Sequence, residues 1–101
     1  MKIHLRDKDR EEIIKILRDS FIETPEVWVF GSRINGSSHD ASDLDIVLRS
    51  EGLDGLDEKE FLQFKESLRE SRIPIVIDAF DWFRIPNEFR ENILKNYQVL
   101  A

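Results

Sequence analysis

Apolar residues recur every three or four positions in three segments of the chain, which is the spacing of one helix face. An aspartate followed three residues later by a glutamate also fits the pattern of a helix capping box, at Asp9 with Glu12 and at Asp57 with Glu60. We therefore predict three amphipathic helices. They cover residues 9–22, residues 57–71 and a segment that begins near Pro86.

Three other apolar runs have the character of β-strands. Residues 27–30 are β-branched and aromatic, Leu44, Ile46 and Leu48 lie at alternate positions, and residues 73–80 form a third run. Helices and strands alternate along the chain, so we predict an α/β (α+β) fold in which helices pack on a small sheet. The connection between the first two strands is too short for a crossover helix, which favours antiparallel neighbours in a mixed sheet.

Composition narrows the class of protein. A chain of 101 residues, 41% apolar, predicts one globular domain over residues 1–101. No apolar run approaches the ~20 residues of a membrane span, so we expect no membrane partner. The lack of cysteine excludes disulfides and fits a cytoplasmic protein. A net charge of −6 without a basic stripe argues against long nucleic acid as the main partner.

Two aspartates, Asp43 and Asp45, lie two positions apart at the start of the second strand. Alternate residues of a strand share one face, so these carboxylates repel each other unless a cation lies between them. If the third strand lies alongside, Asp78 joins them, and three carboxylates can hold two Mg²⁺ ions. Asp81 is the alternative third acid, although its position after the strand favours Asp78.

A turn rich in glycine and serine precedes these acids. Gly31 lets the backbone approach a phosphate closely, and the Ser32 hydroxyl can add a hydrogen-bond donor. Arg33 either contacts phosphate or forms a structural salt bridge. We expect Gly36 to allow the sharp turn that returns the chain to the acids, and Ser42 to position the first carboxylate.

The order of this turn, the paired acids and the later acid resembles that of the minimal nucleotidyltransferases, small members of the DNA polymerase β-like superfamily. The resemblance covers residues 27–82. It implies the nucleotidyltransferase fold, with Gly31 and Ser32 on the triphosphate of ATP and Asp43, Asp45 and Asp78 on Mg²⁺. It further implies transfer of a nucleoside monophosphate with release of pyrophosphate, Asp78 helping to deprotonate the attacking hydroxyl.

Proteins of this minimal type often form a pair with a helical HEPN ribonuclease toxin, which they adenylylate on a tyrosine. The resemblance therefore implies an antitoxin that transfers AMP from ATP to a hydroxyl of a protein partner. Two alternatives stay open. The chain could be a non-catalytic antitoxin that binds its partner and ATP. Alternatively, it could modify a small hydroxylated molecule, which a homo-oligomer could bind in a pocket between its subunits.

Overall fold

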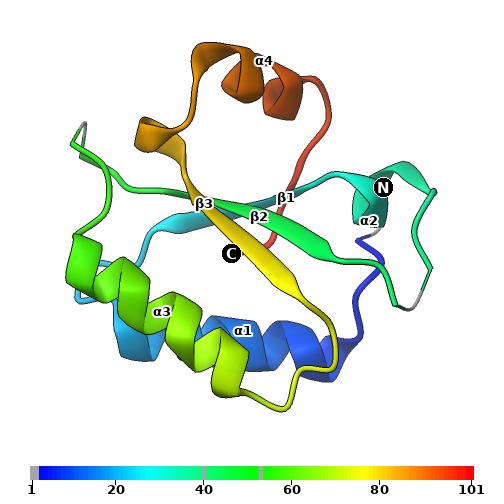
Figure 1. Ribbon diagram of the computed structural model, residues 1–101, viewed down its shortest axis with the longest axis horizontal. Coiled ribbons are helices and arrows are strands. Elements are labelled where there is room, and N and C mark those ends of the chain that lie inside the picture. Colours follow the sequence, from blue (N-terminus) through cyan, green and yellow to red (C-terminus); the bar gives the residue numbers. More distant parts are fainter. Residues whose placement is uncertain (1–2, 40, 53) are drawn as a thin grey trace.

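A four-stranded sheet forms the centre of the fold (Figure 1). The computed structural model describes residues 3–39, 41–52 and 54–101. The strands lie in the order β3-β2-β1-β4, so β3 and β4 are the two edges of the sheet. Their bounds are Glu26–Phe30 for β1, Leu44–Arg49 for β2, Ile77–Asp81 for β3 and Gln98–Val99 for β4.

The sheet is mixed, as the sequence predicts. β1 pairs with β2 and β4 in antiparallel orientation, whereas β2 and β3 run parallel. In this register Asp45 of β2 lies beside Phe30 of β1 on one side and beside Asp78 of β3 on the other. The predicted antiparallel pairing of the first two strands is confirmed.

Helices cover both faces of the sheet (Figure 1). α1 (Asp7–Ser20) and α3 (Glu58–Glu70) lie together on one face. The 3-10 helix η1 (Trp82–Arg84) and α4 (Asn87–Lys95) lie on the other. The short helix α2 (Ser32–Asn35) follows β1 directly, where the sequence predicts a loop with one helical turn. Among the described helices, none combines the length and apolar character needed to cross a membrane.

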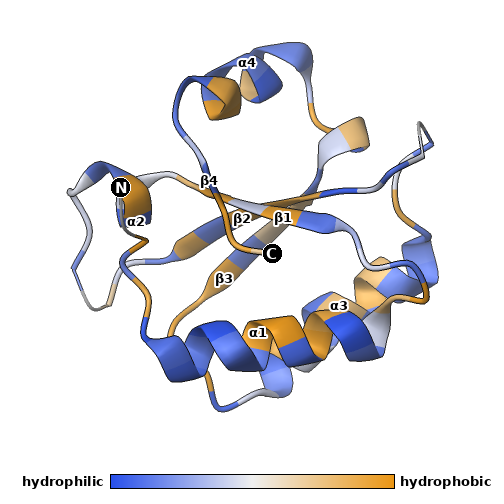
Figure 2. Ribbon diagram, turned by 180° about the vertical axis from the view of Figure 1, so that it is seen from behind, coloured by the Kyte–Doolittle hydropathy of each residue, from blue (hydrophilic) through white to orange (hydrophobic). Residues whose placement is uncertain are grey.

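Strand alternation separates two cores. One face of β2 carries three fully buried residues that belong to the core under α1 and α3, namely Leu44, Ile46 and Leu48. Val47 of the same strand belongs to a second cluster on the other face. This alternation of apolar and polar residues is visible along the strands in Figure 2. The second cluster is largely aromatic, because Trp28 stacks on Tyr97 at 4.3 Å between ring centroids and meets Trp82 edge-on at 5.2 Å.

Of the two predicted capping boxes, one is confirmed in part and the other is wrong. Asp57 caps α3 by accepting hydrogen bonds from two backbone N–H groups of the first turn, as predicted, but the Glu60 carboxylate accepts a hydrogen bond from Ile22 N at 3.0 Å. The capping box predicted at Asp9 is wrong, because α1 begins earlier, at Asp7. Asp9 is instead buried inside the first turn, where it accepts a hydrogen bond from the Arg6 guanidinium at 2.8 Å.

The last two strands also differ from expectation. β3 begins at Ile77, and residues 73–76 precede it as an irregular segment, which includes Pro74 without a backbone donor for a ladder. Asp78 is the second residue of β3, within the strand as predicted. β4 was not predicted, because two residues carry too little alternation; it joins the sheet through a hydrogen bond from Leu100 N to Val27 O at 2.8 Å.

Candidate active site

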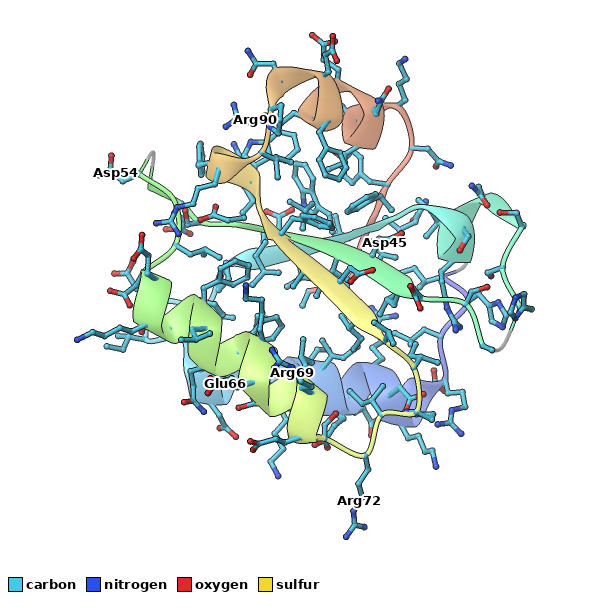
Figure 3. The ribbon with its side chains drawn as sticks, in the orientation of Figure 1. Asp45, Asp54, Glu66, Arg69, Arg72 and Arg90 are labelled. Carbon is cyan, nitrogen blue, oxygen red and sulfur yellow. The ribbon has the colours of Figure 1, made fainter. Side chains whose placement is uncertain are left out.

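Three aspartates converge where β2 and β3 run side by side. Asp45 and Asp78 are direct neighbours across the parallel ladder, and Asp43 immediately precedes β2. Because Asp45 lies two positions before Val47, its side chain is on the sheet face that α4 partly covers. Figure 3 shows Asp45 on β2, the strand next to β3. The structure therefore brings together the acids that the sequence singles out.

The electrostatics of this cluster are unfavourable for the bare carboxylates. Burial raises the pKa of Asp45, and the negative charges of Asp78 and then Asp43 raise that pKa further. The described residues provide no hydrogen-bond donor to any of these three carboxylates. A half-buried acid that has acidic neighbours and no donor is better suited to a cation than to a structural role.

The donor set fits a hard divalent cation. Carboxylate oxygens are the ligands that Mg²⁺ prefers, and Asp43 and Asp78 are both exposed, so their side chains have room to adjust. Within the described ranges, no group of three or more acidic or histidine side chains is close enough to enclose an ion as it stands. These carboxylates could hold a cation only if their side chains came closer together than they are in this arrangement.

Gly31 forms the wall opposite Asp45. Its φ of +84° lies in the left-handed region, and a Cβ atom there would lie 2.6 Å from Oδ2 of Asp45. Only glycine therefore fits between the end of β1 and this carboxylate. Ser32, the first residue of α2, is half-buried directly after this close approach.

Backbone carbonyls hold the Arg33 guanidinium inside the protein. It is buried, with 4% of its surface exposed. Its guanidinium donates hydrogen bonds to the backbone carbonyl of Ser42 at 2.6 Å and 3.2 Å and to that of His4 at 2.7 Å. The expected phosphate contact therefore gives way to a positioning role, in which Arg33 fixes the residue just before Asp43.

The remaining loop residues hold the turn between α2 and β2. Gly36 ends α2 in the left-handed region at φ +83°, which is the sharp turn expected of it. The Ser42 hydroxyl accepts a hydrogen bond from His39 N at 2.9 Å, so Ser42 closes the loop before the acids. His4 Nδ1 lies 2.6 Å from the Ser38 hydroxyl, which ties the loop to the N-terminal segment. No sequence pattern pointed to that contribution of His4.

Asp81, the alternative third acid, has a structural role. It is 3% exposed, and its carboxylate accepts hydrogen bonds from Leu56 N at 2.9 Å and Phe83 N at 3.1 Å. Arg84 adds a cation 3.6 Å away. Asp81 and Asp78 lie three positions apart on β3 and so point to opposite faces. The geometry selects Asp78 as the acid beside Asp45.

An aromatic surface borders the acids, and sequence analysis did not connect it with the site. Phe80 follows Asp78 by two positions and meets Phe30 at 6.0 Å and Phe89 at 5.1 Å between ring centroids. All three rings are partly exposed. For Phe80, the sequence feature that could have revealed this position is the alternation along β3, which places it on the same face as Asp78.

Comparison with known proteins agrees with this geometry. Residues 11–101 match the family described as polymerase beta, nucleotidyltransferase. The chain is 36% identical over 88 residues to a probable protein adenylyltransferase MntA of Haemophilus influenzae, covering 87% of this chain and 75% of that protein. It is 33% identical over 73 residues to the protein adenylyltransferase MntA of Shewanella oneidensis, covering 71% of this chain and 52% of that protein.

Solved structures share the fold. A crystal structure of a toxin–antitoxin with AMP-PNP superposes with a TM-score of 0.74 at 24% identity, over 92% of this chain and 73% of that one. A tri-AMPylated Shewanella oneidensis HEPN toxin in complex with MNT antitoxin gives a TM-score of 0.69 at 20% identity, over 96% of this chain and 72% of that one. The expected nucleotidyltransferase fold is thus confirmed. With the family match spanning most of the sequence, and the acid cluster in place beside Gly31, the chain belongs to the polymerase beta nucleotidyltransferase family.

Proposed function

We propose that this chain is a Mg²⁺-dependent protein adenylyltransferase that moves AMP from ATP to a hydroxyl of a HEPN toxin and acts as its antitoxin. The observation that carries this proposal is the convergence of Asp43, Asp45 and Asp78 beside Gly31 in a chain of this family. The similarity to two MntA protein adenylyltransferases and to toxin–antitoxin complexes supports the choice of acceptor. We retain the expectation of a single domain over residues 1–101.

Each residue has a chemical task in this proposal. Asp43, Asp45 and Asp78 would hold two Mg²⁺ ions, and such ions would supply positive charge for the triphosphate and for the displacement. Gly31 and Ser32 would receive the phosphate oxygens through backbone N–H groups and the Ser32 hydroxyl. The acceptor oxygen forms a bond to the α-phosphorus of ATP while the bond to pyrophosphate breaks, and Asp78 takes the hydroxyl proton.

The test is intact-mass measurement of the partner. The chain is co-expressed with the HEPN toxin that co-purifies with it, and the complex is incubated with ATP and Mg²⁺. We expect the toxin to gain the mass of one or more adenylyl groups, and the variant Asp43→Asn with Asp45→Asn to leave its mass unchanged. An unmodified toxin that the double variant still neutralises would support the non-catalytic alternative instead.

Metal dependence gives an independent check that needs no acceptor. Calorimetric titration of the chain with ATP should show binding in Mg²⁺ and a sharp loss of affinity in chelator, because three carboxylates repel the triphosphate. Equal affinity under both conditions would contradict the proposed metal site.

A further inference from the structure

A groove of about 540 Å³ lies along β3, next to the acid cluster. Residues 73 and 75–80 form one side of it, and Lys65, Leu68 and Arg69 of α3 form the other. Asp78 and Phe80 both line this groove, so it is continuous with the candidate active site. A molecule bound in the groove would therefore lie directly beside the third carboxylate.

The groove follows an unpaired edge of the sheet. β3 pairs with β2 on one side only and is the last strand of the described sheet on the other. Proteins normally protect such an edge with charges, proline or a covering segment, since its free N–H and C=O groups pair with other chains. Here the groove is lined mainly by apolar side chains, and Val76 at its rim is 60% exposed. These features fit an extended polypeptide that adds a strand.

The charges along the groove indicate which polypeptide fits. On the α3 side the groove carries Arg69 and Lys65, although the protein as a whole has a net charge of −6. The Lys65 ammonium lies 4.7 Å from the centroid of the Phe61 ring, and the carboxylate of Asp78 lines the β3 side, so Arg69 is the cation that an acidic segment would meet. Figure 3 shows Arg69 extending from α3 towards the sheet, while Arg72 extends away from the molecule. Within the described part of the chain, Arg69 has no ion-pair partner. Acidic side chains on the bound segment would supply one.

We propose that the acceptor protein docks an extended acidic segment into this groove as an additional strand on β3, with the hydroxyl to be adenylylated presented at Asp78. This inference rests on the proposed function and names the surface that recognises its acceptor. A second copy of the chain is less suitable, because a two-fold contact between β3 edges would bring like charges of Lys65 and Arg69 together.

The test compares two identical charge reversals, one in the last turn of α3 and one just after the helix ends. Arg69→Glu reverses a charge inside the groove, whereas Arg72→Glu reverses one outside it. With the co-purifying HEPN toxin as acceptor, we expect Arg69→Glu to raise the KM for the toxin about tenfold and Arg72→Glu to leave it unchanged. Affinity for ATP with Mg²⁺ should be the same in both variants. Equal KM values for the two variants would overturn the proposal.

Hydrogen–deuterium exchange tests strand addition itself. We expect the backbone amides of β3 to exchange more slowly in the toxin complex than in the chain alone. A complex in which the toxin is adenylylated but β3 gains no protection would overturn the docking proposal and leave the proposed function intact. Protection of β3 that appears in the chain alone as its concentration rises would assign the groove to a second copy. An unmodified toxin with every variant would instead refute the proposed function.

Discussion

The two ends of the β2–β3 pair present the same local arrangement with opposite outcomes. At each end a glycine with φ +84° makes room for a carboxylate that a Cβ atom would meet: Gly31 at 2.6 Å from Asp45 and Gly55 at 2.9 Å from Asp81. Donors then converge on Asp81, whereas two further carboxylates converge on Asp45. The carboxylate at one end is satisfied by donors within the fold, whereas the described residues supply none to the carboxylate at the other end, where we propose a cation.

This contrast separates structural acids from candidate catalytic acids better than burial alone. Asp81 is the more deeply buried of the two, and it is also the better satisfied, because two backbone N–H groups and Arg84 surround it. Asp45 is half-buried with a raised pKa. Active sites commonly retain such an unfavourable carboxylate, because the free energy of ligand binding offsets its cost to the stability of the fold.

The largest expected effect is loss of transfer at the acidic end. Replacing Asp43 and Asp45 with asparagine together should lower the rate of AMP transfer about 1,000-fold or more, because the metal ligands are lost. The rate is measured by mass spectrometry of the acceptor, and circular dichroism should show an unchanged fold. Asp54→Asn, in an exposed turn, is the control and should behave like the unaltered chain.

The second prediction compares the same substitution at Asp81 and at Asp78. Asp81→Asn should lower the free energy of unfolding by about 2–3 kcal/mol, because an amide cannot serve both backbone donors and Arg84 equally well. Asp78→Asn should leave stability nearly unchanged and abolish most transfer. Urea denaturation and the transfer assay on both variants check this. If Asp81→Asn were the inactive, stable variant, the assignment of the two ends would be reversed.

The glycines allow a smaller test of the same contrast. Gly31→Ala and Gly55→Ala should each cost about 1–2 kcal/mol of stability, since both impose a left-handed φ and a close contact on alanine. Only Gly31→Ala should also weaken binding of ATP with Mg²⁺, because it displaces Asp45. Calorimetry on the two variants distinguishes them, and equal loss of nucleotide binding would remove the special role of Gly31.

The smallest effect concerns pH. The pKa of Asp45 is raised above 3.8 in the folded state, so its carboxylate ionises less readily there than in the unfolded chain. The contribution of Asp45 to the free energy of unfolding is therefore most favourable below pH 3.8, and it declines as the pH rises through the pKa of the folded state. Relative to the unaltered chain, Asp45→Asn should gain stability at neutral pH and gain nothing at pH 3, as measured by urea denaturation with chelator present.

Addition of Mg²⁺ sharpens this measurement. The ion should raise the stability of the unaltered chain at neutral pH and have little effect on Asp45→Asn, because a cation favours the ionised carboxylate. A stability difference that is independent of both pH and Mg²⁺ would show that the repulsion at Asp45 has no energetic consequence.

Much of this arrangement could be predicted from the sequence, because strong local patterns determine it. Alternation along β2 separates Asp45 from the buried Leu44 and Ile46, and the short connection after Phe30 makes β1 and β2 antiparallel. What local patterns could not show depends on distant residues. The role of Arg33 is set by carbonyls of Ser42 and His4, and the late start of β3 is set by its pairing with β2.

Asp81 illustrates the same limit. Strand position favours Asp78 over Asp81 in the sequence, but the N–H groups of Leu56 and Phe83 and the guanidinium of Arg84, which give Asp81 its structural role, cannot be read from it. β4 is a further case, since two residues become a strand only because β1 offers them an edge. Sequence patterns located the acids, and tertiary contacts decided what each acid does.

The link between Arg33 and His4 has a practical consequence for anyone handling this protein. Backbone atoms of His4 and Arg33 also bond directly, from His4 N to Arg33 O at 2.7 Å. An affinity tag or fluorophore fused ahead of His4 would therefore act, through Arg33, on the loop that leads to the candidate site residue Asp43. Kinetic work should begin with tag-free material, and a dye placed there would report on the state of that loop.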